Sequence, residues 1–397
     1  MARRGVRFVL TFLMIAIVFS MAGVVAAVFF VSRGPSVPSD ATLVLRVPGG
    51  LTEVRPSGLL GQVFEAPPTL RSVVDSLRKA AVDDRVSRVV LVPSGGQARW
   101  AKVQEVRDAV LAFKQSGKPI VAYLEYGGEQ QYYLATATDE IALMPTSPLD
   151  LTGLASYALF LRGTLDKAGA YPDFLHVGDY KAAANQYTEE SFTPAHREMS
   201  ESLNADLFDQ LVRGIADGRG RPESEVRALI DEGPFLPEDA LAAGLVDGLA
   251  YEDQLLDLDE NGERRIEGRD YAAVSLQSVG LNRGPKIAVI HAVGVISTGR
   301  SGYDTTQGEI VGSDSLVEYL REVREDANVR AVVLRIDSPG GSAIASDVIW
   351  REVEVTREVK PVIASMSDVA ASGGYYIAMP ADAIVAQPAT LTGSIGV

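Results

Sequence analysis

The strongest hydrophobic pattern in the chain is an apolar run near the amino terminus. Residues 8–31 read FVLTFLMIAIVFSMAGVVAAVFFV and contain no charge. A helix over these 24 residues is about 36 Å long, which exceeds the roughly 30 Å hydrocarbon core of a bilayer. Three arginines precede the run and only Arg33 follows closely, so the positive-inside rule places the rest of the chain outside the cytoplasm. We predict a retained anchor, because the apolar core of a cleaved signal peptide, the alternative, is normally about 7–15 residues long.

Farther along the chain, short β-branched runs alternate with amphipathic helical runs. In the last third the predicted strands are Lys286–Val295, Val329–Ile336 and Pro361–Ser365, and the predicted helices are Ser313–Asp326 and Ala345–Val359. Apolar residues at helical spacing define the first of these helices. Strands separated by helices of this length are typical of βαβ crossovers, so the pattern predicts an α/β fold with a buried, largely parallel sheet.

The chain also repeats itself at offsets of 240 to 245 residues. KPIVA at 118–122 returns as KPVIA at 360–364, YYLA at 132–135 as YYIA at 375–378, LTG at 151–153 as LTG at 391–393, and VVLVPSGG at 89–96 as VVLRIDSPGG at 332–341. We therefore predict a cytoplasmic tip, transmembrane anchor and linker over residues 1–40, a first copy of one domain over 41–280, and a second copy over 285–397. The second copy matches only the first half of the first, so we expect it to be truncated.

Composition excludes several classes of function. The net charge of −15 argues against nucleic-acid binding, because acidic residues outnumber the basic residues that could neutralise phosphates. The chain has no cysteine, which rules out disulfides and thiol nucleophiles. Its three histidines lack the spacing of a metal site. We predict neither a metal nor a cofactor.

Two small-residue turns are candidates for chemistry. Asp337–Ser342 (DSPGGS) joins a predicted strand to a predicted helix, where backbone N–H groups can bind a developing negative charge; a plain structural turn is the alternative. Ala370–Tyr376 (AASGGYY) places Ser372 at the start of another helix, where it is either a nucleophile or a helix N-cap. The first copy has GEQQ at this place, without a hydroxyl, and this difference favours chemistry at Ser372.

A nucleophilic serine needs a base. His176 lies in an apolar stretch, DFLHV, and is predicted to be a packed strand residue. His196 falls in a polar helical stretch and His291 in a strand, so no Ser-His-Asp set emerges. A lysine made neutral by burial is the other option. Lys181, which lies between a glycine turn and three alanines, is one candidate, but by sequence alone a surface lysine near Glu189 and Glu190 is the preferred interpretation.

These motifs resemble the signal peptide peptidase A family, long form (protease IV). The resemblance rests on SPGG at 338–341, ASGGYY at 371–376, TGSIG at 392–396 and the GDYKAA run at 178–183, and it covers nearly the whole chain. It implies tandem ClpP/crotonase-like domains, a membrane-bound serine peptidase and a tetramer that degrades cleaved signal peptides and other extended apolar peptides. The roles that it implies are nucleophile for Ser372, general base for Lys181, lysine-orienting residue for Ser394, and oxyanion hole for Gly340, Gly341 and Gly373.

The resemblance places the protein in the bacterial inner membrane, with one span and with the catalytic part on the periplasmic side. Three alternatives stay open. One is a related membrane peptidase of the same fold with another substrate. A crotonase-like acyl-CoA enzyme is disfavoured by the predicted export. A catalytically inactive membrane scaffold is the third, because the first copy shows that this domain can lack a nucleophile.

Overall fold

The computed structural model describes residues 14–15, 20–21, 35–55, 67–96, 99–256 and 264–395. The predicted anchor therefore lies almost wholly outside the described residues. No helix within these ranges is long and apolar enough to cross a bilayer.

Within the described residues, the first copy is built on a six-stranded parallel sheet in the order β7-β5-β3-β2-β1-β8. Its strands are β1 (Ala41–Val47), β2 (Val86–Pro93), β3 (Ile120–Leu124), β5 (Glu140–Leu143), β7 (Gly248–Leu249) and β8 (Arg265–Glu267). A short ribbon of β4 (Gly127–Gly128) and β6 (Leu149–Asp150) accompanies it. Apolar residues fill both faces of β1 and β2, as is usual for a parallel sheet covered by helices.

Helices of the first copy cover this sheet and extend away from it. They are α3 (Leu70–Val82), α4 (Trp100–Lys114), α5 (Glu129–Ala135), α6 (Arg162–Ala168), η1 (Ala182–Ala184), α7 (Asn185–Thr188), α8 (Pro194–Arg219), α9 (Glu223–Glu232), α10 (Pro237–Ala242), α11 (Glu252–Leu255), α12 (Gly268–Ala272) and η2 (Leu276–Val279). The long helix α8 begins at Pro194 after the side-chain cap Thr193 and ends at Arg219, where the C-cap Gly220 has φ 62°. We call residues 155–203, which include α6, α7 and the start of α8, the arm.

The second copy has a parallel sheet in the order β15-β14-β13-β9, the same order as β5-β3-β2-β1 in the first. Its elements are β9 (Lys286–Val293), β13 (Val329–Ser338), β14 (Val362–Ala371), β15 (Ala383–Val385), β16 (Leu391–Gly393), α13 (Ser313–Glu325), α14 (Ala343–Arg357) and α15 (Gly373–Ala378). A small sheet of β10 (Val295–Ser297), β12 (Gly308–Gly312) and β11 (Gly302–Asp304) lies beside it. The predicted α/β class with parallel sheets is confirmed.

Individual contacts recur at the repeat offset. Lys118 Nζ donates to the carbonyls of Ala80 and Asp83 at the end of α3. Lys360 Nζ donates in the same way to the carbonyls of Val323 and Asp326 at the end of α13. The two sheets therefore share local contacts as well as strand order, while the domain boundaries themselves stay a prediction.

The strands of the second copy differ in length from their predicted bounds. The predicted strand Lys286–Val295 ends at Val293, because Gly294 turns the chain at φ 101° and a Cβ there would lie 1.9 Å from Glu309 O. The predicted strand Pro361–Ser365 instead continues to Ala371. Its second half carries serine, aspartate and alanines, which do not have the composition of a strand.

The prediction for His176 was wrong. Residues 172–177 form no strand, and Leu175 and Val177 are 92% and 78% exposed. His176 itself is exposed. Hydrophobicity over a few residues cannot distinguish a buried strand from an apolar surface loop, because both give the same short apolar run.

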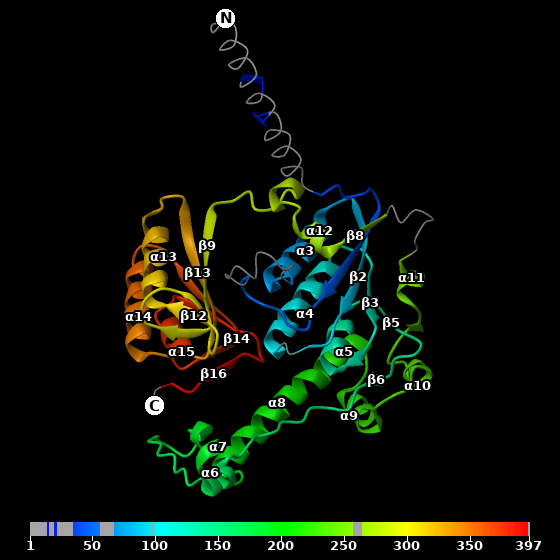
Figure 1. The fold of residues 1–397 in the computed structure, drawn as a ribbon. Coiled ribbons are helices and arrows are strands. Elements are labelled where there is room, and N and C mark those ends of the chain that lie inside the picture. The colour runs from blue at the N-terminus through cyan, green and yellow to red at the C-terminus, as the bar shows by residue number, and fades with distance from the viewer. Residues whose placement is uncertain are drawn as a thin grey trace, which may run out of the picture.

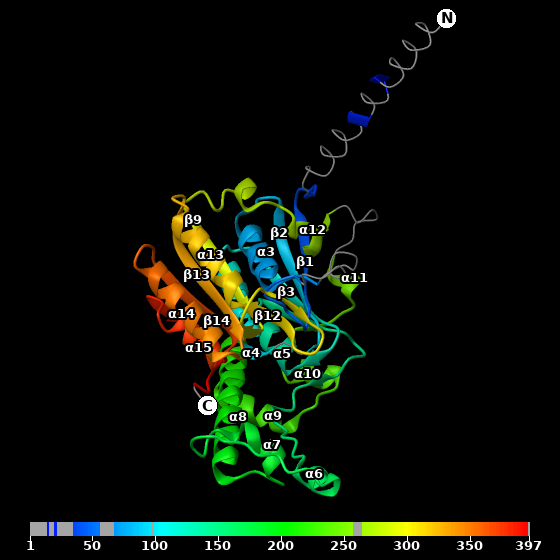
Figure 2. The ribbon, with the colours of Figure 1, turned by 60° about the vertical axis from the view of Figure 1, so that its left-hand side comes forward.

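The two copies lie side by side, with helices of the first copy between the two sheets (Figure 1). Helix α4 packs against β14 of the second copy. Turned by 60°, the second copy still stands next to α4, and α8 still leads away toward α6 and α7 (Figure 2). In both views the arm lies below the carboxyl-terminal strand of the second copy, so segments far apart in sequence meet there.

Candidate active site

Ser372 has a backbone conformation that L-residues rarely adopt. It is the N-cap of α15 with φ 50° and ψ −118°, and its side chain does not cap the helix. Its N–H donates to Gly393 O at 2.8 Å, and the residue is half-buried. No described residue forms a hydrogen bond with its hydroxyl. Ser372 therefore occupies the N-cap position without capping the helix through its side chain. A strained serine with an unengaged hydroxyl is a feature that clusters at functional sites.

The glycine turn after β13 packs directly against this serine. Gly340 has φ 97°, and a Cβ there would lie 2.6 Å from Gly373 N and 2.8 Å from Ser372 Cβ. Only glycine fits at this approach. The Gly340 N–H donates to Ser338 Oγ at 3.1 Å, and Ser338 Oγ donates to Gly294 O at 2.6 Å. Because this bond occupies the Gly340 N–H, that group is not available to a ligand in this arrangement.

Two other backbone N–H groups border the same place. A Cβ on Gly373 would lie 3.4 Å from Gly341 N, so the two glycine backbones are close neighbours. Within the part of the chain that the structure describes, neither the Gly341 N–H nor the Gly373 N–H donates a hydrogen bond. These are the donors that remain for a developing oxyanion.

The arm brings Lys181 to the second copy. The residue precedes η1, and its N–H donates to Gly178 O at 3.2 Å. The neighbouring Tyr180 hydroxyl donates to Glu198 of α8 at 2.8 Å, which ties the loop to the long helix. Lys181 Nζ donates to Ile395 O at 3.3 Å. The structure thus places this lysine, from the first copy, on the segment that follows β16.

One short segment contacts both Ser372 and Lys181. Gly393 accepts the hydrogen bond of the Ser372 N–H, and Ile395 accepts that of Lys181 Nζ. Ser394 lies between them, is exposed, and has φ 49°. The predicted nucleophile, base and lysine-orienting serine therefore converge on residues 393–395, although they come from both copies.

The other charged candidates have different surroundings. Burial would lower the pKa of Lys102, but the carboxylates of Asp337 and Asp368 hold it above its ordinary value, so this lysine stays protonated. His291 lies in β9 with Nδ1 4.0 Å from Glu53 Oε2, and burial lowers its pKa. Among the described residues, no histidine is hydrogen-bonded to Ser372.

Sequence reasoning missed the buried ion cluster of Lys102, Asp337 and Asp368. Asp337 belongs to a motif that the sequence singles out, but nothing in the sequence marks Lys102 as its partner. Lys102 lies 235 residues before Asp337. Only the packing of α4 against β14 brings the three side chains together.

The place in the first copy that corresponds to Ser372 is occupied by Glu129. Its Oε1 accepts hydrogen bonds from the N–H and the hydroxyl of Thr152, at 3.1 and 3.2 Å. Nearby, the side chain of Gln131 donates to Ser94 O at 3.2 Å. Side chains fill this turn where the second copy has glycines, so the first copy offers no nucleophile there.

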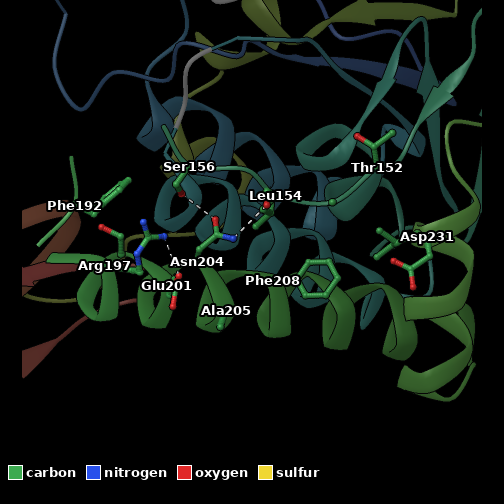
Figure 3. A pocket seen from close by; sticks show the side chains of 13 residues that line it. Thr152, Leu154, Ser156, Phe192, Arg197, Glu201, Asn204, Ala205, Phe208 and Asp231 are labelled. Carbon is green, nitrogen blue, oxygen red and sulfur yellow. Dashed lines mark hydrogen bonds and ion pairs between the residues drawn. The ribbon is translucent and has the colours of Figure 1, made fainter. Parts of the chain in front are cut away.

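A cavity of about 510 Å³ lies between α8 and residues 152–156 (Figure 3). Ser156 lines this cavity, and its hydroxyl donates to Asn204 Oδ1 at 2.9 Å. The lining contains no lysine or histidine to act as a base. Size alone would nominate this cavity as a binding site, but the predicted nucleophile Ser372 is not among its lining residues. In the described ranges, no group of three or more histidines or carboxylates could hold a metal ion.

Comparison with known proteins relates these residues to a family. The model of peptidase family S49 matches residues 112–264 and 354–397. The chloroplastic serine protease SPPA of Arabidopsis thaliana is 38% identical over 343 residues, which cover 84% of this chain and 50% of the relative. Protease 4 of Salmonella typhi is 34% identical, covering 83% and 55%, and Protease 4 of Haemophilus influenzae is 30% identical, covering 94% and 65%.

The chain thus spans between half and two-thirds of the length of these curated relatives. Its second matched block, residues 354–397, contains the strained serine turn and the segment that Lys181 contacts. The resemblance predicted from the motifs is confirmed: the chain is similar to peptidase family S49 and, over most of its own length, to the serine protease SPPA and to Protease 4.

Proposed function

We propose that this protein is a membrane-anchored serine endopeptidase with a Ser372/Lys181 dyad built from both copies. The observation that carries the proposal is the convergence of the strained Ser372 and the arm lysine on residues 393–395. Ser372 presents an unengaged hydroxyl, and Lys181 Nζ donates to Ile395 O on the segment that follows β16. Ser394, between the two contacts, is assigned the role of orienting the lysine.

The reaction is acyl transfer. The Lys181 amine, in its neutral form, takes the proton of the Ser372 hydroxyl as the oxygen attacks a peptide carbonyl. The N–H groups of Gly341 and Gly373 stabilise the oxyanion, and Gly340 contributes the close approach of the turn rather than a hydrogen bond. The leaving amine departs with a proton from Lys181. Water then hydrolyses the acyl-enzyme by the same route.

The proposed substrates are cleaved signal peptides and other extended apolar peptides. Support comes from the family relationship and from the apolar run at residues 8–31, which would hold the protein in the bacterial inner membrane with the described part on the periplasmic side. The proposal includes assembly into a tetramer. Tyr157, Leu175 and Val177 of the arm are 94%, 92% and 78% exposed, and exposed apolar patches of this kind mark interaction sites.

The test is covalent labelling of the full chain with a fluorophosphonate probe, together with hydrolysis of an apolar peptide. Ser372→Ala and Lys181→Ala should each lower both rates by about 10³-fold or more, because members of a catalytic unit fail together. Lys167→Ala, an exposed lysine of the same arm, and Ser156→Ala, in the cavity, are matched controls that should retain both rates. Labelling that survives in Ser372→Ala, or activity that survives in Lys181→Ala, would remove the corresponding assignment.

A further inference from the structure

A buried ion cluster joins the two copies next to the proposed active site. Lys102 lies in the first turn of α4 and is 7% exposed. Its Nζ lies 2.7 Å from Asp337 Oδ2 and 3.4 Å from Asp368 Oδ2, and both carboxylates belong to the second copy. The Lys102 backbone N–H donates to Asp368 Oδ1 at 2.9 Å. Because Arg99, the N-cap of α4, supplies no side-chain bond, Asp368 caps this helix from the other copy.

The cluster coincides with an irregularity between β13 and β14. Ile336 pairs with Met366 and Ser338 pairs with Ala370, so Asp337 alone stands opposite residues 367–369. Asp337 Oδ1 accepts the Val369 N–H at 3.2 Å, and this side chain thereby satisfies a group that the sheet leaves unpaired. Extra residues of this kind bend a strand and redirect the chain beyond it. The path of β14 after the irregularity therefore depends on where Asp337 and Asp368 are held.

Both strands lead from this irregularity directly into the proposed active site. Asp337 immediately precedes Ser338, whose hydroxyl holds the glycine turn through the Gly340 N–H. Asp368 lies four positions before Ser372 on β14. Lys102 Nζ thus connects the strand of the oxyanion turn with the strand of the nucleophile, near the carboxyl-terminal end of each strand.

The charges make this connection strong. Two carboxylates face each other here, Asp368 with 6% and Asp337 with 15% of its side chain exposed. Burial together with Asp337 raises the pKa of Asp368 above its ordinary value, although Lys102 opposes the rise. Without the ammonium, the two carboxylates would repel each other in a site that is largely shielded from water. Breaking a buried ion pair from one side leaves an uncompensated charge, which is far more costly than losing an exposed pair. The irregularity would then be expected to open.

We propose that Lys102 is a positioning residue of the active site, which holds the oxyanion turn and the nucleophile strand of the second copy in register from the first copy. The inference rests on the proposed Ser372/Lys181 function and extends it, since the first copy then supplies the lysine that sets the geometry as well as the lysine that moves the proton. Lys102 does not itself contact Ser372. It acts through Asp337 and Asp368.

The experiment measures how fast a fluorophosphonate probe labels Ser372 in the full chain. The dependence of this rate on probe concentration gives two quantities, the binding constant of the probe and the maximal labelling rate. Lys102→Met should lower the maximal rate by about tenfold to a hundredfold with little change in binding, because small misplacement of reacting groups costs this much. Lys102→Arg, which keeps a cation between the carboxylates, should recover most of the rate. The matched control is Glu105→Gln, on the same helix, which breaks the 2.7 Å ion pair with Arg335 of the second copy without touching Asp337 or Asp368, and should label like the wild type.

A second variant keeps the test decisive if Lys102→Met does not fold. Lys102→Met combined with Asp368→Asn removes both charges and leaves an amide oxygen to cap α4. It should fold, as judged by its thermal unfolding, yet label at least about tenfold more slowly than the wild type. Wild-type labelling in either folded variant would overturn the inference, as would equal losses in Lys102→Met and Glu105→Gln. Failure of the wild type to label at Ser372 would instead defeat the proposed function, so the two failures are distinct.

Discussion

At the scale of single residues, the turn at Gly340 decides whether Ser372 can keep its position. An added methyl group would lie 2.6 Å from Gly373 N and 2.8 Å from Ser372 Cβ. We expect Gly340→Ala to lower the labelling rate of Ser372 by about 100-fold, because the serine must move, and to cost about 1–3 kcal/mol of stability through its strained φ. Labelling kinetics and chemical denaturation measure the two effects.

Gly299→Ala separates the strain from the clash. Gly299 has a similar φ of 91°, but nothing lies within 4 Å of a Cβ built there. Gly299→Ala should lose stability because of its positive φ, but it should label at the rate of the wild type. If it lost labelling as Gly340→Ala does, backbone strain anywhere in the second copy would explain the effect, and the contact between Gly340 and Ser372 would not.

Glu53 should make stability depend on pH below neutrality. Burial would raise the pKa of this carboxyl, but the hydrogen bonds from Arg335 and Ser367 hold it below its ordinary value of 4.5. A depressed carboxyl stabilises the fold fully above its unfolded pKa and loses this contribution as the pH falls from there through the folded pKa. The urea midpoint of the wild type should therefore drop more steeply between about pH 5 and pH 3 than that of Glu53→Gln.

At neutral pH, Glu53→Gln should be less stable than the wild type. The loss should be smaller than the roughly 3–5 kcal/mol of a fully broken buried pair, because Glu105 still binds Arg335 at 2.7 Å. Glu322→Gln, an exposed carboxylate of α13, serves as the control and should keep the pH dependence of the wild type. Parallel pH curves for the wild type and Glu53→Gln would contradict the prediction.

The residue scale also shows what the sequence could and could not predict about the site. Ser372 and the glycine turn are recognisable because their types and spacing are unusual and local. That the Gly340 N–H bonds Ser338 could not be predicted, since it depends on how the turn folds back. Lys102 could not be predicted either, because it pairs with residues of another copy.

At the scale of elements, a lysine in each copy donates hydrogen bonds to carbonyls at the carboxyl end of one helix. Lys360 Nζ donates to Val323 O and Asp326 O at 2.6 and 2.5 Å, and Lys118 makes the equivalent bonds at α3. The last carbonyls of a helix lack partners within it and attract cations. We expect Lys360→Met and Lys118→Met each to cost about 1–2 kcal/mol in urea denaturation.

Lys167→Met provides the comparison for both substitutions, because this lysine is exposed on α6. It should change stability by less than about 0.5 kcal/mol. If all three variants were equally stable, the lysine contact would recur in both copies without contributing to the stability of the fold.

Elements were predictable where their pattern is strong and regular. The helix predicted at Ser313–Asp326 is observed at Ser313–Glu325, because its apolar stripe packs into the core. β14 was predicted too short, since its second half is held by its pairing with β13 and β16 rather than by its composition. His176 was predicted to pack in a strand because its neighbours are apolar, but in the structure this apolar stretch is an exposed loop of the arm.

At the scale of the whole molecule, the two copies meet through buried polar contacts as well as through α4 and β14. Lys102 binds Asp337 and Asp368, Arg335 makes two hydrogen bonds to Glu53, and Gln104 accepts the Ala389 N–H at 2.9 Å. Residues 282–284, which lie between the two copies, are exposed. The packing of the copies should therefore hold without the covalent connection.

We predict that the copies stay together and active after this connection is cut. A specific protease site inserted at residues 282–284 suits the test, because exposed connecting segments tolerate insertion. The two fragments should elute together in size-exclusion chromatography and Ser372 should still be labelled, since Lys181 reaches the second copy through space. The same cut in a Lys102→Met, Arg335→Met double variant should release the fragments, because it leaves Asp337, Asp368 and Glu53 without their cations at the interface. Fragments of the otherwise unaltered chain that separate under native conditions would show that the linker, and not the buried ion pairs, holds the active site together.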